Sequence, residues 1–94
     1  MFIVSLTYLC EMDEIENHLS SHIAYLDRHY ASGHFLASGR KNPRTGGIIL
    51  ANVESAHVLD GIIAEDPFKI NNLAHYEMIE FIPSKVAPPL AFLL

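Results

Sequence analysis

The segment FIVSLTYLCEMDEIENHL (residues 2–19) contains the change of periodicity that decides the fold. Apolar residues alternate with other residues from Phe2 to Tyr8, which is the period-2 pattern of a β-strand. The period then lengthens to that of a helix, and apolar residues recur at Ile15, Leu19, Ile23, Leu26 and Tyr30. We therefore expect a strand followed by an amphipathic helix.

Local signals predict where this helix begins and ends. Asp13, followed three residues later by Glu16, resembles a capping box at a helix start. Gly33 follows the last apolar position and is the residue type that most often ends a helix. The expected helix extends from about Asp13 to Ser32.

The remaining sequence predicts three more strands and one more helix. Strands are expected over residues 35–40, 47–53 and 76–82. Residues 41–46 have the composition of a hairpin loop. Ser55 is expected to cap a short helix that ends at Asp66-Pro67, because the residue before a proline disfavours the helical conformation.

The order β-α-β-β-α-β predicts an α+β, ferredoxin-like fold, in which two helices cover one face of a four-stranded antiparallel sheet. Residues 48–51 are apolar at consecutive positions, so a strand there would present hydrophobic side chains to both faces of the sheet. A second sheet packed on the open face would cover them. We therefore expect a homodimer or a higher oligomer.

Length and composition limit the function classes. Residues 1–94 are expected to form a single domain, and no apolar run approaches the roughly 20 residues that span a membrane. The net charge is −5 and the six Lys and Arg are dispersed, which disfavours nucleic acid as a partner. The lone Cys10 and the lack of an export signal favour a cytoplasmic location. Residues 86–94 form an apolar tail that we expect to dock on protein.

His22 is the first candidate for chemistry. On a helical wheel it lies at the edge of the apolar stripe, where an imidazole is partly desolvated and can still reach a cavity. General acid–base catalysis requires such a group, although on periodicity alone a structural, hydrogen-bonded histidine is the commoner case. His18 lies four residues earlier, but no third ligand is evident and we expect no metal site.

Asp66 is the second candidate. At the C-terminus of the predicted helix, the macrodipole would disfavour its negative charge. A neighbouring imidazolium would compensate, and the carboxylate would in turn orient the ring, which gives an acid–base dyad. The alternative is a solvated carboxylate that only marks the end of the helix.

Three residues at the end of the second predicted strand, Ser38, Gly39 and Arg40, are candidates for substrate binding. Glycine would permit close backbone approach, and arginine suits bidentate contact with a carboxylate. Arg44, in the following loop, could bind the same anion.

These features together resemble the YCII-related (YciI-like) family. The resemblance is carried by His22, Gly33, Ser38-Gly39, Gly46-Gly47 and Asp66-Pro67-Phe68, and extends from Met1 to about Val86. It implies a ferredoxin-like domain that dimerises as an α+β barrel, with His22 and Asp66 as a catalytic dyad and with Ser38 and Gly39 nearby. Many members of the family follow the strand-end glycine with proline, whereas here Arg40 follows.

The resemblance implies a small enzyme without metal or organic cofactor, of the isomerase, lyase or hydrolase type. The family includes a dehydrochlorinase that acts on a chlorinated aromatic diol. The expected ligand is a small carbonyl-bearing or aromatic molecule. Two alternatives remain: a module that binds a small ligand without turnover, and an assembly protein that associates through Pro88 to Leu94.

Overall fold

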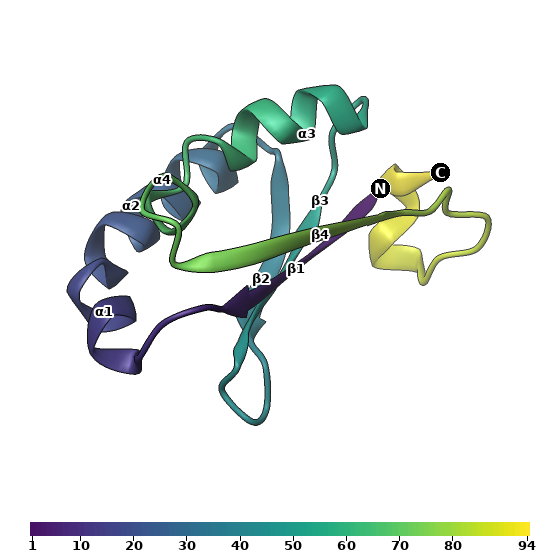
Figure 1. Ribbon diagram of the computed structural model, residues 1–94. Helices are drawn as coiled ribbons and strands as arrows, with labels where there is room; N and C mark the ends of the chain where they lie inside the picture. Colours follow the sequence, from purple (N-terminus) through teal and green to yellow (C-terminus); the bar gives the residue numbers. More distant parts are fainter.

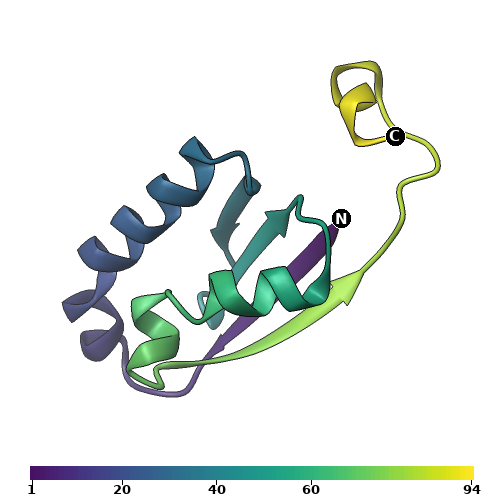
Figure 2. The same ribbon diagram turned by 90° about the horizontal axis from the view of Figure 1, so that it is seen from above.

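The computed structural model describes all 94 residues and contains one four-stranded sheet, with the helices on one of its faces (Figures 1 and 2). The elements are, in chain order, β1 (Phe2–Tyr8), α1 (Met12–Asn17), α2 (Leu19–Ala31), β2 (Phe35–Arg40), β3 (Gly46–Ala51), α3 (Ala56–Ile63), α4 (Pro67–Ile70), β4 (Ala74–Glu80) and the 3-10 helix η1 (Pro88–Leu93). The strand order is β2-β3-β1-β4, and all neighbours are antiparallel. The predicted α+β, ferredoxin-like fold is confirmed.

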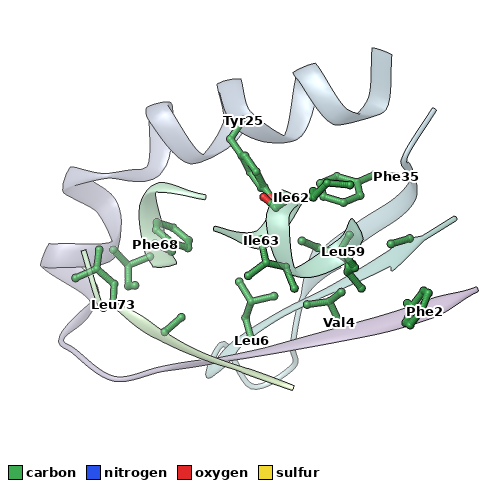
Figure 3. Close-up of a cluster of buried hydrophobic side chains, with 14 residues drawn as sticks. Phe2, Val4, Leu6, Tyr25, Phe35, Leu59, Ile62, Ile63, Phe68 and Leu73 are labelled. Carbon is green, nitrogen blue, oxygen red and sulfur yellow. The ribbon is translucent and has the colours of Figure 1, made fainter. Parts of the chain in front are cut away.

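The central strand β1 pairs with both β3 and β4 and contributes side chains to the core. Val4 lies opposite Ile49 of β3 and Met78 of β4. The alternation of β1 turns Phe2, Val4 and Leu6 toward the helices, where all three are buried. Figure 3 shows these side chains below α2 and α3. Together with the other buried hydrophobic side chains, they fill the space between the sheet and the helices.

The predicted helix over residues 13–32 is wrong in two respects. It is two helices, because His18 leaves the helical conformation (φ −109°, ψ 4°) between α1 and α2. Its N-cap is Glu11, without a side-chain capping bond, so Asp13 lies in the first turn and forms no capping box. The expected stop is confirmed, since Gly33 adopts a φ of +82° that favours glycine.

The buried face of α2 also differs from the predicted apolar stripe. Ile23 and Tyr30 are 46% and 38% exposed, whereas Tyr25 and His29 are buried. Both buried residues have their polar atoms satisfied, since the Tyr25 hydroxyl donates to the Ile62 carbonyl at 3.0 Å and both His29 ring nitrogens have partners. Figure 3 shows Tyr25 pointing from α2 toward Ile62. Hydrophobicity alone does not identify such aromatic polar residues as core.

The position of Asp66 corrects another prediction. Ser55 does cap α3, because its Oγ accepts the Val58 N–H at 3.2 Å. However, α3 ends at Ile63, and Asp66 is the N-cap of the short helix α4, with Pro67 as the first helical residue. The expectation that Asp66 opposes a helix dipole is therefore wrong.

Two strand boundaries and the tail complete the comparison. Strands β3 and β4 each begin and end earlier than predicted. Within β3, Gly46 is required by packing, because an added Cβ would overlap the Leu6 carbonyl.

Segment η1 lies away from the sheet and the helices (Figure 2), and Phe92 and Leu94 are exposed. Docking of the tail on protein stays a prediction. No helix is long and apolar enough to cross a bilayer.

Candidate active site

The carboxylate of Asp66 is the centre of the site. Its side chain is fully buried, at 0% exposure, and it accepts hydrogen bonds from three groups. Oδ1 accepts from the backbone N–H of Phe68 at 3.0 Å and pairs with Nδ1 of His22 at 2.8 Å. Oδ2 accepts from the Tyr76 hydroxyl at 2.6 Å. Three partners compensate the cost of burying a charge that would otherwise be prohibitive.

The Asp66–His22 bond fixes the tautomer of the histidine. A carboxylate only accepts hydrogen bonds, so Nδ1 of His22 carries a proton, and in the neutral form of the ring the free lone pair is on Nε2. Every buried side-chain nitrogen and oxygen in the structure has a hydrogen-bond partner, yet Nε2 has none. Nε2 is therefore accessible to solvent, and His22 presents a basic nitrogen to whatever enters the site.

The Asp66-Pro67-Phe68 motif positions this histidine from two sides. Proline at the first position of α4 favours the local helix start, in which the Phe68 N–H points to the Asp66 carboxylate. The Phe68 ring lies parallel to the His22 ring, with 4.0 Å between centroids and 6° between planes. The carboxylate thus holds Nδ1 of His22 toward Asp66, and the phenyl ring of Phe68 restricts the tilt of the imidazole.

Tyr76 is the residue that sequence reasoning missed. It lies on β4, ten residues from Asp66, and its hydroxyl completes the carboxylate's set of donors. Burial raises the pKa of Tyr76 well above its ordinary value, and the charge and hydrogen bond of Asp66 raise it further. The phenol is therefore held neutral, as a donor. The alternation of β4 could have indicated an inward tyrosine, but nothing local could have indicated its partner.

Tyr25 supports the site from the core side of α2. Burial raises its pKa above the ordinary value, with a further contribution from the Asp66 charge. Its hydroxyl stays protonated and donates to the Ile62 carbonyl at 3.0 Å. This bond joins α2, the helix that carries His22, to α3.

A cavity of about 190 Å³ lies beside His22. Seven hydrophobic residues form its apolar walls: Leu6, Tyr8, Leu19, Leu26, Ile48, Ile49 and Phe68. The predicted binding residues Ser38, Gly39 and Arg40 also line it, together with Arg44. The structure therefore brings all five predicted site residues to one cavity or directly behind it.

Two details of the cavity wall differ from the expectation. An added Cβ at Gly39 would meet nothing within 4 Å, so the close backbone approach expected there occurs at Gly46 instead. The Ser38 hydroxyl lies 2.6 Å from that of Tyr30, so α2 and β2 are joined by a hydrogen bond at the rim. Ser38 contributes to the shape of the rim as well as its polarity.

The other histidines have different environments. Nδ1 of His18 donates to the Glu14 carbonyl at 3.0 Å, so His18 and His22 do not face a common point. His29 pairs with Glu65 and with His34, both at 3.1 Å. No group of three or more His, Cys, Asp and Glu side chains is arranged to hold a metal ion.

Comparison with known families matches residues 1–82 to the YCII-related domain. The chain belongs to the YCII-related family. Among solved structures, it is similar to 5-chloro-2-hydroxyhydroquinone dehydrochlorinase from Burkholderia phenoliruptrix, in complex with 2,5-dihydroxybenzoquinone. The TM-score is 0.74 at 16% identity, over 85% of this chain and 91% of that one. A search of curated proteins gives no match. At this identity the structural similarity establishes the shared fold.

Proposed function

We propose that this member of the YCII-related family is an enzyme that transfers protons on a small, ring-bearing molecule, with His22 as the catalytic acid–base residue. The observation that carries the proposal is the asymmetry of the His22 ring. Nδ1 is held by a fully buried carboxylate at 2.8 Å, whereas Nε2 has no protein partner and is accessible. Asp66 is the positioning residue, because it selects the tautomer and stabilises the imidazolium that forms.

The chemistry starts when Nε2 accepts a proton from an acidic O–H or C–H of the ligand. The electron pair left on the ligand then either expels a leaving group, which is elimination, or takes a proton back at another atom, which is isomerisation. The same base could activate water for hydrolysis. In each case Asp66 balances the positive charge on the ring, and Arg40 adds positive charge to the cavity wall.

The ligand class follows from the cavity and is supported by the structural neighbour. Apolar and aromatic side chains form most of the wall of a cavity of about 190 Å³. An apolar cavity of about 150 Å³ binds benzene, so a single substituted ring fits here. The similar dehydrochlorinase was solved with 2,5-dihydroxybenzoquinone. Elimination from a ring carrying acidic hydroxyls is therefore the reaction type we favour, with Ser38, Gly39 and Arg40 as substrate-binding residues.

We also propose that the chain acts as a homodimer, assembled through the sheet face opposite the helices. Ile3 lies opposite Leu50 on one side and Ile79 on the other, so three apolar side chains form a row across this face. Ile79 is 58% exposed in the isolated chain. Packing this row against its counterpart would give an α+β barrel, and sedimentation measures the mass directly. The unpaired Cys10 suits the reducing cytoplasm.

The decisive experiment compares His22→Gln with the wild type on chlorinated hydroquinones and small lactones. Loss of positioned acid–base catalysis should lower kcat by about 10² to 10⁴, measured as chloride release or disappearance of the lactone. His29→Gln is the matched control, because His29 lies two turns further along α2 and also pairs with a carboxylate. Equal turnover by His22→Gln and wild type would contradict the assignment. Saturable binding with no conversion of any compound would favour a ligand-binding module instead.

A further inference from the structure

The cavity is lined by positive charge, whereas the protein as a whole is negatively charged. The chain has eleven Asp and Glu against six Lys and Arg, and its net charge is −5. None of the 13 residues that line the cavity is acidic, whereas two, Arg40 and Arg44, are arginines. A random placement of charges on this chain would favour acidic residues. The lining of the cavity therefore carries positive charge on a protein whose net charge is negative.

Both arginines are free to bind a ligand. Neither forms an ion pair, since the three ion pairs of the structure all join a histidine to a carboxylate. Neither guanidinium takes part in a side-chain hydrogen bond within the chain, whereas the neighbouring Lys41 donates to Thr7 at 3.2 Å. Both side chains belong to exposed residues at the β2–β3 hairpin, one at the end of β2 and one in the loop.

We propose that the substrate carries a permanent carboxylate on its ring, and that Arg40 and Arg44 together bind this group as the determinant of specificity. The proposal rests on the proposed function, since the same ring must reach Nε2 of His22. The two planar guanidinium groups match the two oxygens of a carboxylate. A substrate held in this way bridges the hairpin and α2, with its acidic proton toward the histidine and its carboxylate toward the hairpin.

The buried charge of the dyad fixes this orientation. Asp66 lies directly behind His22, so a second carboxylate at that end would be repelled. At the hairpin the anion would meet two exposed arginines, and no acidic residue lines the cavity there. The opposite orientation places the anion at the His22 end of the cavity, nearer to the Asp66 charge, and leaves both arginines unpaired. Specificity thus comes from attraction at one end and repulsion at the other.

The test uses two probes that differ only in this group, 2,5-dihydroxybenzoate and 2,5-dihydroxybenzamide. Binding is measured by calorimetry with the wild type, the double variant Arg40→Gln/Arg44→Gln, and Lys85→Gln as the control. Lys85 is an exposed cation that does not line the cavity. We expect the wild type and Lys85→Gln to bind the acid roughly tenfold or more tightly than the amide, a ratio typical of one or two charge-assisted hydrogen bonds. The double variant should bind both probes equally.

Two outcomes overturn the proposal: the amide binds as tightly as the acid to the wild type, or the double variant retains the preference. Absence of saturable binding of the acid up to about 10 mM, the weakest binding such a contact would give, overturns it as well. His22→Gln separates this proposal from the proposed function, because that variant should lose turnover and keep the tenfold preference. Preference without any effect of His22 on turnover would leave the carboxylate site standing and remove the catalytic role.

Discussion

Helix α2 presents two histidines, His22 and His29, to two adjacent carboxylates, Asp66 and Glu65. The distances are similar, 2.8 Å for His22–Asp66 and 3.1 Å for His29–Glu65. Both histidines are largely buried, with side chains 12% and 8% exposed. By residue type and distance the two pairs look equivalent.

Their surroundings separate them. The Asp66 side chain is 0% exposed and accepts from three donors, whereas the Glu65 side chain is 52% exposed and has His29 as its side-chain partner. Nε2 of His22 is free beside a cavity, but the second nitrogen of His29 lies 3.1 Å from His34. The first pair can exchange a proton with a ligand, and the second has both nitrogens engaged. The catalytic role proposed for His22 therefore depends on a rigidly held carboxylate and an open nitrogen, and the second pair has neither.

Removing each carboxylate in turn should give the largest difference between the two pairs, measured as the free energy of unfolding. Asp66→Ala leaves two buried donors and the start of α4 without an acceptor, and should lower the free energy of unfolding by about 3 kcal/mol. Glu65→Ala, at the exposed pair, should cost less than about 1 kcal/mol. Urea unfolding at pH 7 measures both. Equal losses would show that Asp66 is no more important to the fold than its neighbour.

Tyr76→Phe tests the donor that only the first pair possesses. At pH 7 the loss of its hydrogen bond to Asp66 should cost about 1 kcal/mol. The raised pKa of Tyr76 also gives a pH dependence: above pH ~10 the unfolded tyrosine loses a proton that the folded one keeps, so stability falls as pH rises.

The phenylalanine variant lacks this penalty. Between pH 7 and pH 11 the difference in unfolding free energy should move by about 1.4 kcal/mol in favour of the variant, because one tyrosine fewer titrates on unfolding. The deficit of about 1 kcal/mol at pH 7 should therefore disappear, and the variant should be slightly more stable than the wild type at pH 11. Urea unfolding at the two pH values provides the measurement, and the other titrating groups are common to both proteins. A deficit that stays constant would mean that the Tyr76 phenol is not protected by the fold.

The sequence predicted the sheet better than the helices. Alternation from Phe2 to Tyr8 marks β1 correctly, because a strand with one buried face shows its period directly. The stripe on α2 was misplaced, because Tyr25 and His29 are buried through specific hydrogen bonds. Those bonds reach Ile62 and Glu65, more than thirty residues away, and no local pattern contains them.

For the site, the family motif was more informative than the electrostatic argument. His22 and Asp66 do lie together, but Asp66 is an N-cap, so the reason first given for their pairing does not hold. Tyr76 was missed because its role exists only after β4 pairs with β1 and α4 packs above it. The family motif already singled out His22 in the sequence, and the folded geometry adds how its surroundings differ from those of His29.

The finest test of the comparison is Glu65→Gln, which keeps an oxygen acceptor for His29 and removes only the charge. The carboxylate is half exposed, so solvent already screens its interaction with the ring. The free energy of unfolding of the variant at pH 7 should differ from that of the wild type by less than about 0.5 kcal/mol, and its turnover should be unchanged. Both values should be measured at low and at high salt, because a screened surface pair loses its small contribution as ionic strength rises. A clear loss of turnover would mean that charge at the second pair reaches the cavity, and the separation of the two histidines would then fail.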